Sequence, residues 1–272
     1  MELIRQRHPS QGQLVIAISL QSGSNGNCFY VEADGTAILV DAGIPGIQAQ
    51  CRLAKHGRDL RDVAAVLLSH DHIDHARHTG ALHRKFRFPV YCTAATMARM
   101  REKMAVGTIA DLRVFTAGQR VTIGNLNVET IPTPHDGADG VAFVIRAGEV
   151  RLGVLTDLGH LFEGLATTVA SLDGVILESN YDPDMLANGP YPPWLQERIR
   201  GPRGHLSNEE SATLLRAADP TRLQWACLAH LSENNNLPDL ARATHRSLLG
   251  QGLRLAIASR HEPCGPFALV SP

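Results

Sequence analysis

The sequence has no long hydrophobic run and little cysteine. No apolar stretch approaches the roughly twenty residues that a helix needs to cross a bilayer, so we expect no membrane span. Residues 1–5 contain no extended apolar segment, so no secretory signal peptide is expected. The five cysteines are widely spaced, odd in number and never arranged as Cys-x-x-Cys. A disulfide framework or a thiolate zinc site is therefore not expected, and a cytoplasmic location fits this pattern.

The chain also lacks an excess of either charge. Its formal net charge is −1, whereas nucleic-acid-binding domains usually show a basic excess. Phosphate recognition would then have to come from local groups or from metal ions. Basic residues cluster at two places, where a solvated surface is the ordinary interpretation: Arg84, Lys85 and Arg87, and Arg198, Arg200 and Arg203. With 272 residues and 44% hydrophobic content, the sequence predicts one globular domain over residues 1–272.

Histidine, by contrast, is abundant, and three of the thirteen fall in residues 69–75. This segment follows the apolar run 63–68, which predicts a buried strand. His70 and His72 project to the same side of an extended backbone, so they can share one ion. Asp74 and His75 follow a turn and can hold a second ion. Imidazole and carboxylate groups suit zinc, iron or manganese. A solvated loop without metal is the alternative, but the complete His-x-His-x-Asp-His string favours the metal site.

Further candidate ligands lie at the ends of predicted strands. His135 follows two prolines that restrict the backbone, and Asp157, Glu178 and His230 each follow an apolar run. His135 could complete the ligands of the first ion and His230 those of the second, with Asp157 bridging the two. Each residue alone would more often be structural, but their order along the chain favours the joint interpretation.

Periodicity and turn residues predict an α/β fold with two sheets between helices. Predicted strands cover 14–20, 28–32, 36–40, 63–68, 89–92, 114–116, 120–123, 127–131, 141–146, 151–155, 174–177, 223–229 and a last strand 254–258. Predicted helices cover 45–56, 79–86, 93–104, 182–186, 192–199, a segment opened by Ser207, and 237–249. Thr93, Asp182 and Ser207 are expected helix N-caps, and Glu210 completes a capping box with Ser207.

This ordered set of residues resembles the metallo-β-lactamase fold hydrolases over essentially the whole chain. The resemblance implies an αβ/βα four-layer sandwich with a dinuclear metal site at one sheet edge. It also implies that Asp41 supports the metal loop rather than binding metal. Four stretches look like the YycJ/WalJ type: 19–28, 178–182, 204–208 and 230–235. Proteins of that type are implied to be metal-dependent 5′→3′ exonucleases acting on DNA.

The resemblance also implies roles around two divalent ions, with zinc, manganese or iron as candidates. Asp74 would orient the attacking water, and His205 would assist the leaving oxygen with Glu178 as its partner. Both His205 and His230 precede Leu-Ser, so either could be the last ligand; His230 is preferred because it directly ends a buried strand. By composition, the loop that follows the first strand is predicted to be an ordinary turn. The resemblance implies instead that this loop forms one wall of the site. The expected contacts to a terminal phosphate or to the strand are Ser22, Ser24, Asn25, Asn27 and Arg203.

Two other hypotheses fit parts of the sequence. A small-molecule metallohydrolase, such as a lactonase or a cyclic phosphodiesterase, would use the same metal site, and the near-neutral charge suits it better. A non-catalytic binding module with this fold would have no need for seven metal ligands. The nuclease hypothesis is preferred over both, with nucleic acid, most simply DNA, as the substrate.

Overall fold

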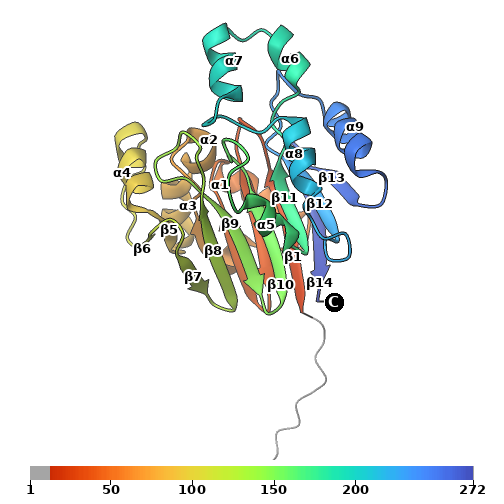
Figure 1. The fold of residues 1–272 in the computed structure, drawn as a ribbon. Helices are drawn as coiled ribbons and strands as arrows, with labels where there is room; N and C mark the ends of the chain where they lie inside the picture. Colours follow the sequence, from red (N-terminus) through yellow and green to blue (C-terminus); the bar gives the residue numbers. More distant parts are fainter. Residues whose placement is uncertain (1–12, 272) are drawn as a thin grey trace, which may run out of the picture.

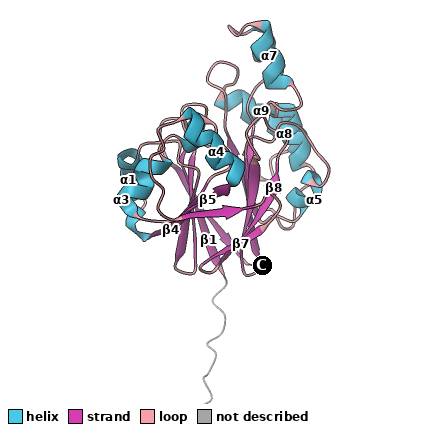
Figure 2. Cartoon of the chain, turned by 90° about the vertical axis from the view of Figure 1, so that its left-hand side faces the viewer, coloured by secondary structure: helices cyan, strands magenta, loops and turns pink. Residues whose placement is uncertain are grey.

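The computed structural model describes residues 13–271, and within them two seven-stranded sheets pack face to face (Figures 1 and 2). The first sheet has the order β14-β1-β2-β3-β4-β5-β6 and the second β13-β12-β11-β10-β9-β8-β7. The strands of the first sheet are β1 (Leu14–Gln21), β2 (Cys28–Ala33), β3 (Thr36–Val40), β4 (Val63–Leu67), β5 (Val90–Thr93), β6 (Leu112–Phe115) and β14 (Cys264–Val270). Those of the second sheet are β7 (Arg120–Ile123), β8 (Leu126–Pro132), β9 (Val141–Ala147), β10 (Val150–Leu155), β11 (Gly174–Glu178), β12 (Trp225–Ala229) and β13 (Arg254–Ile257).

Helices cover the outer face of each sheet (Figure 2). They are α1 (Gly46–Ala54), α2 (Ile73–Ala76), α3 (Thr79–Phe86), α4 (Ala94–Lys103), α5 (Leu165–Ala170), α6 (Pro183–Asn188), α7 (Pro193–Arg200), α8 (Asn208–Leu215) and α9 (Pro238–Leu249), with a 3₁₀ turn at Leu60–Asp62. One apolar core lies between the sheets, a second under α1, α3 and α4, and a third under α5, α8 and α9. Three cores between four layers confirm the predicted αβ/βα sandwich.

The strand directions bring the predicted site residues to one edge. β3 and β4 are parallel, and β1 runs the same way because two antiparallel pairings separate it from β3. In the second sheet β10, β11 and β12 are parallel, and β8 shares their direction for the same reason. The loops that follow these strands therefore leave at their carboxyl ends, where α/β folds form their binding sites.

Local sequence signals account for the start of three helices. Thr93, Asp182 and Ser207 are N-caps whose side chains accept hydrogen bonds from the first turns of α4, α6 and α8, as predicted. Ser207 and Glu210 form the expected capping box. These bonds satisfy backbone donors that a helix cannot pair internally, so each helix begins at a defined residue.

Several elements differ from the prediction. The strand 254–258 is not the last one, because β14 follows it and pairs antiparallel with β1. Gly265 and Pro266 gave no strand signal in the sequence, but proline is tolerated there because β14 is an edge strand. The short helices α2 and α5 and the 3₁₀ turn at Leu60–Asp62 were also not predicted. The prediction of one domain over 1–272 stays a prediction, since residues 1–12 and 272 lie outside the described range.

The helices α6 and α7 project beyond the site edge of the sheets (Figure 1). We call residues 183–200 the α6–α7 cap. It has a small apolar cluster of its own, formed by Tyr181, Leu186, Tyr191, Leu195 and Ile199. Within residues 13–271 no helix is both long and apolar enough to span a membrane.

Gly43 gives a test of how tightly the edge loops pack. Its N–H donates to the Asn27 carbonyl at 2.9 Å, and the Asn27 N–H donates to the Asp74 carbonyl at 2.7 Å. A Cβ at Gly43 would collide with the Asp74 carbonyl oxygen and lie 2.6 Å from the Asn27 nitrogen. Gly43→Ala should therefore lower the free energy of unfolding by about 1–3 kcal/mol in a urea titration.

Gly252→Ala is the matched control, because a Cβ there meets nothing within 4 Å. It should change the free energy of unfolding by less than about 0.5 kcal/mol. Equal stability of the two variants would show that the loops at Gly43 can separate without cost.

Candidate metal centre

The loop after β4 carries the densest group of candidate ligands. The short helix α2 begins directly after His72, which places Asp74 and His75 in its only turn. Asp41, at the end of β3, lies behind this loop and accepts hydrogen bonds from the Ser69 N–H at 2.8 Å and the Ser69 hydroxyl at 3.0 Å. Its carboxylate also lies 2.7 Å from His75 Nδ1. Asp41 thus orients the His75 ring so that Nε2 faces the centre of the site.

The predicted ligands converge into overlapping groups. In each group the donor atoms lie within 4.8 Å of one another, and the groups are His70, His72 and His135; Asp74, His75 and His230; His70, His75 and Asp157; and Asp157, Glu178, His205 and His230. The first two groups are the two coordination sets that the sequence predicted. All seven predicted ligands therefore lie together, although they come from four loops of two sheets.

Asp157 lies between the two sets. Its Oδ2 is 3.2 Å from His75 Nε2, and its Oδ1 is 3.5 Å from His135 Nε2 and 3.7 Å from His230 Nε2. One carboxylate thus reaches histidines of both groups, which is the arrangement expected of a bridging ligand.

Three strand ends at the site adopt left-handed backbone. Asp41, Asp157 and His230 have φ values of 64°, 56° and 56°, although none of them is glycine. Such conformations cost of order 1–3 kcal/mol each and persist where the surrounding structure imposes them. Here they turn each side chain toward the edge immediately after a buried strand.

The electrostatics of the site favour a bound cation. Burial, with His75 nearby, holds the pKa of His70 well below its usual range, and burial lowers the pKa of His72 to about 4. Both rings are therefore neutral at pH 7, with lone pairs free for a metal. Burial would raise the pKa of Asp157, but the surrounding histidines, His230 foremost, hold it well below its usual range.

The pKa of His75 also indicates that the surrounding carboxylates favour a positive charge at the centre of the site. Burial acts to lower its pKa, yet Asp157, Asp74 and Asp41 together raise it well above the ordinary value. The carboxylates thus hold a proton on this ring. A divalent cation at the same place would supply that charge and release the ring as a ligand.

Unpaired buried atoms complete the case for a metal. Among residues 13–271, the buried His70 Nε2 and Asp157 Oδ2 have no hydrogen-bond partner. An unsatisfied buried polar group costs about 1–3 kcal/mol, so such atoms need an explanation. Imidazole nitrogens and carboxylate oxygens that converge from several loops form a donor set that suits a divalent transition metal.

His205 and Glu178 form a pair beside these groups. His205 Nδ1 lies 2.6 Å from Glu178 Oε1, and Glu178 Oε2 accepts a hydrogen bond from the Leu158 N–H at 2.9 Å. Burial acts to lower the pKa of His205, but Glu178 outweighs it and the net pKa is raised. The His205 side chain is 18% exposed and that of His230 only 4%. The more open ring is His205, which suits a group that meets substrate.

The loop 22–27 forms one wall of the site but divides into two kinds of residue. Ser22 and Asn27 are buried, and Ser22 Oγ accepts a hydrogen bond from the His230 N–H at 2.8 Å. Asn27 Nδ2 lies 3.2 Å from Asp74 Oδ2 and 3.0 Å from His75 Nε2. Ser24 and Asn25 are exposed, so they are the members that a ligand can reach.

A family model described as a beta-lactamase superfamily domain matches residues 36–226, more than two thirds of the chain. The chain belongs to the beta-lactamase superfamily. The matched segment holds every candidate ligand except His230. The predicted superfamily resemblance is thereby confirmed.

Individual relatives narrow the family. Exodeoxyribonuclease WalJ of Streptococcus pneumoniae serotype 2 is 32% identical over 234 residues, covering 85% of this chain and 87% of the relative. Exodeoxyribonuclease YycJ of Bacillus anthracis is 31% identical over 230 residues, with the same two coverages. Within the beta-lactamase superfamily, the chain therefore belongs with WalJ and YycJ, as the motifs indicated.

A solved structure supports the fold. The metallo-beta-lactamase fold protein YhfI from Bacillus subtilis aligns with a TM-score of 0.73 over 95% of this chain and 100% of its own, at 16% identity. At that identity the likeness concerns the fold, and it agrees with the two-sheet sandwich described above.

The sequence analysis did not identify two charged residues that lie at the candidate site. Asp136 Oδ1 lies 3.2 Å from His72 Nε2, while its Oδ2 accepts a hydrogen bond from Arg198 Nε at 2.7 Å. Arg260, after β13, donates to Ser24 Oγ at 3.3 Å and to Glu233 Oε2 at 3.0 Å. The position of Asp136 next to His135 could have indicated the first, but only the fold brings Arg260 to the loop after β1.

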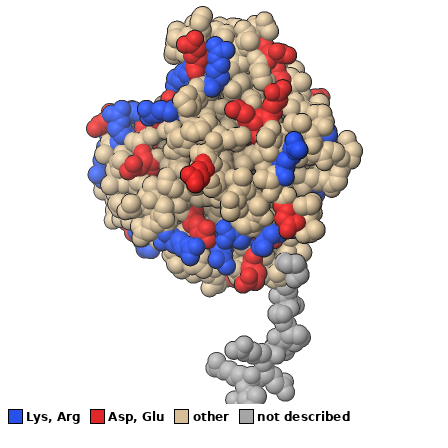
Figure 3. Space-filling model, viewed as in Figure 1, with Lys and Arg blue, Asp and Glu red and all other residues tan. Residues whose placement is uncertain are grey.

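Charge is mixed on the face of the molecule that Figure 3 shows. On this face lysine and arginine are interspersed with aspartate and glutamate. Arg203 is exposed, and its carbonyl accepts a hydrogen bond from the Asp136 N–H at 3.1 Å. Near the candidate site, positive charge that could meet a phosphate comes from Arg203 and from Arg198 and Arg260, which also pair with Asp136 and Glu233.

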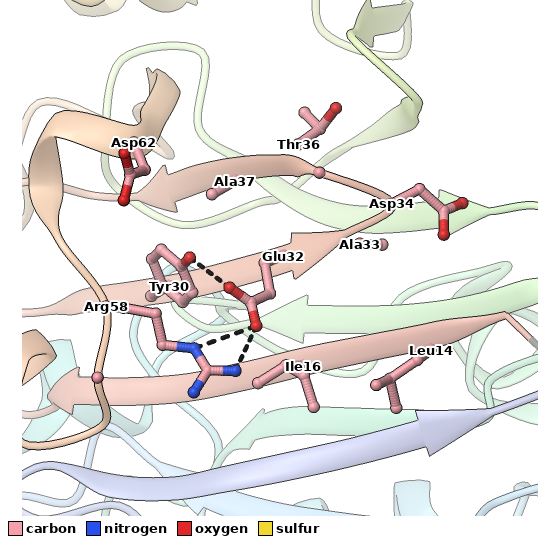
Figure 4. Close-up of a pocket in the computed structure, with 12 residues that line it drawn as sticks. Leu14, Ile16, Tyr30, Glu32, Ala33, Asp34, Thr36, Ala37, Arg58 and Asp62 are labelled. Carbon is pink, nitrogen blue, oxygen red and sulfur yellow. Dashed lines mark hydrogen bonds and ion pairs between the residues drawn. The ribbon is translucent and has the colours of Figure 1, made fainter.

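A separate surface pocket of about 420 Å³ lies on the β1–β3 side (Figure 4). Glu32 within it accepts a hydrogen bond from the Tyr30 hydroxyl at 2.6 Å and pairs with Arg58. The charge of Glu32 is thus balanced by Arg58. The residues that line the pocket include none of the candidate ligands. We do not assign this pocket to the candidate site.

Metal binding can be tested without an activity assay. Mn²⁺ or Zn²⁺ should raise the melting temperature of the metal-free chain, because a ligand that binds only the folded state adds about 2.7 kcal/mol to the free energy of unfolding at a hundredfold excess over its Kd.

His230→Ala should lower the amount of metal bound per chain, as measured by elemental analysis. His261→Ala changes an exposed histidine that is not in the cluster and serves as the control. Unchanged metal content in His230→Ala would remove this residue from the site.

Proposed function

We propose that this chain is a metal-dependent exodeoxyribonuclease that binds two divalent ions and digests DNA from the 5′ end. One arrangement carries the proposal: Asp157 lies between two groups of candidate ligands, and the His205–Glu178 pair lies beside them. The relatives named exodeoxyribonuclease WalJ and YycJ support the reaction class and the choice of DNA.

We assign one ion to His70, His72 and His135 and the other to Asp74, His75 and His230, with Asp157 between them. Zinc, manganese and iron are the candidate metals, because each accepts imidazole and carboxylate ligands. When bound, a pair of divalent ions makes a water molecule more acidic and offsets the negative charge of a phosphodiester.

Asp74 is the proposed acceptor for the proton of the attacking water. Burial would raise its pKa, but His75 and His230 hold it well below the ordinary value, so the carboxylate is ionised at pH 7. Its Oδ2 lies 3.3 Å from His230 Nε2 and is also reached by Asn27 Nδ2 at 3.2 Å. These contacts fix the carboxylate in one orientation at the edge of the ligand cluster.

His205 is the proposed donor to the leaving oxygen. Glu178 binds Nδ1, so the proton on Nε2 is free to face a substrate. Glu178 is fully buried and is held in turn by the Leu158 N–H, so the ring has one preferred direction. A departing alkoxide needs a proton or a hydrogen bond, and groups of this kind contribute roughly 10²–10⁴ in rate.

Recognition of the DNA end is assigned to the exposed part of the site wall. Ser24 and Asn25 are accessible, and Arg260 adds a positive charge beside Ser24. Arg203 is exposed near the His135 loop and can meet the backbone of the strand. Ser22 and Asn27, which the sequence assigned to the phosphate, instead hold His230, Asp74 and His75 in place.

A small-molecule metallohydrolase is the second candidate. The mixed surface charge and the net charge of −1 favour it, because nucleic-acid affinity usually depends on many phosphate contacts. The same metal centre would serve a lactone or a cyclic phosphodiester.

A digestion assay separates the two candidates. The metal-reconstituted chain should shorten DNA carrying a 3′ label one nucleotide at a time from a 5′-phosphorylated end, and more slowly from a 5′-hydroxyl end. Single-stranded RNA, a lactone and bis-p-nitrophenyl phosphate are the comparison substrates. Turnover of a lactone or a cyclic phosphodiester without digestion of DNA would favour the second candidate. Equal rates on 5′-phosphorylated and 5′-hydroxyl DNA would contradict the proposed contact with the terminal phosphate.

His205→Ala should keep its bound metal and lose about 10²–10⁴ in kcat, because donation to the leaving oxygen is removed. The measurement is single-turnover cleavage of DNA together with elemental analysis of the same sample.

Glu178→Gln is the companion variant, since it keeps the shape but removes the charge that orients His205. Its loss of kcat should be smaller than that of His205→Ala. In the double variant the two losses should not be fully additive, because both residues act in one hydrogen-bonded pair. Loss of metal in His205→Ala, with full metal content in His230→Ala, would exchange the roles of the two histidines.

A further inference from the structure

Trp194 is exposed on α7, a helix that packs through other residues. Its exposed fraction is 66%, whereas Trp225 is 1% exposed in the core. The next residue, Leu195, packs into the cluster of the α6–α7 cap, as does Ile199 one turn later. The apolar face of α7 is thus covered without Trp194, and folding of the cap gives no reason for an indole at this position.

Trp194 shares a helix face with Arg198, since the two are four residues apart. Arg198 Nε donates to Asp136 Oδ2 at 2.7 Å, and Asp136 Oδ1 lies 3.2 Å from His72 Nε2. On this face of α7, Arg198 lies at the end near the candidate ligands, and Trp194 lies one turn farther from them. The step from Arg198 to Trp194 is about 6 Å along the helix, which one or two nucleotides span.

The cap and the segment that directly follows it contact the site at three further points. The Tyr191 hydroxyl accepts a hydrogen bond from Asn234 Nδ2 at 3.1 Å, in the loop that follows His230. The His205 N–H donates to the Ile199 carbonyl at 2.8 Å, and the Asp136 N–H donates to the Arg203 carbonyl at 3.1 Å. Trp194 is therefore held at a fixed place relative to the candidate catalytic groups, which reduces the entropy lost on binding.

We propose that Trp194 stacks on a nucleobase of a single DNA strand whose end lies in the metal centre. The inference rests on the proposed function and adds to it a preference for single strands, because a paired and stacked base has no free face. The exposed arginines around the cap, Arg198, Arg200 and Arg203, suit the phosphates on either side of that base. Glu197, three residues after Trp194, is the one acidic residue of this helix and lies on the same side as Trp194, beside Arg198.

Aromatic stacking on bases is sequence-tolerant and is commonly found in proteins that bind single strands. Trp194→Ala should therefore raise the KM for single-stranded DNA roughly tenfold to a hundredfold, with a smaller change in kcat. Trp194→Phe, which keeps an aromatic ring, should recover most of the loss. Leu248→Ala removes another exposed apolar side chain, near the end of α9, and should leave KM unchanged.

Fluorescence provides a direct test, because the chain has only two tryptophans and Trp225 is buried. Titration of the wild type with oligodeoxythymidylate should quench the emission, and Trp194→Ala should abolish that quenching. A strand with an abasic site at the stacked position should bind the wild type as weakly as the intact strand binds Trp194→Ala.

The outcomes distinguish this inference from the proposed function. An active wild type whose emission is not quenched, or a Trp194→Ala variant with wild-type KM, overturns the stacking role alone. A wild type that neither binds nor digests DNA overturns both. If Trp194→Ala keeps its DNA affinity but changes the molar mass in sedimentation, the indole contacts a second copy of the chain and the inference is wrong.

Discussion

Buried negative charge at one sheet edge is the constraint on which the site depends. Asp41, Asp157 and Glu178 are all 3% exposed or less, and each contacts a histidine. Isolated carboxylates in such surroundings would be costly, so each needs a partner that carries or accepts positive charge. The crowding of histidines and the raised pKa of His75 both follow from this requirement.

Much of this centre could be predicted from the sequence because its residues follow recognisable strands. His70, Asp157, Glu178 and His230 each come after an apolar run, and parallel strands place their carboxyl ends together. That rule needs only strand order and direction. The helix caps were predictable for a similar reason, because a serine or threonine bonds to backbone three residues away.

What could not be predicted depends on contacts between distant parts of the chain. Ser22 and His230 are 208 residues apart, so composition alone could not show that Ser22 supports the histidine instead of a phosphate. β14 has little strand character of its own and forms because β1 offers an unpaired edge. The ion pair of Arg198 with Asp136, which connects the cap to the loop that carries His135, likewise could not be predicted without the fold.

The two halves of the chain each contribute a part of the candidate centre. His70, His72, Asp74 and His75 come from the first sheet, while His135, Asp157 and His230 come from the second. A nascent chain that ends before residue 230 carries an incomplete ligand set, and the first sheet still lacks the β14 strand that pairs with β1. Domains begin to fold during synthesis, but this one can assemble its centre only after His230 has left the ribosome. Any hydrolytic activity is thereby delayed until both sheets can contribute their ligands.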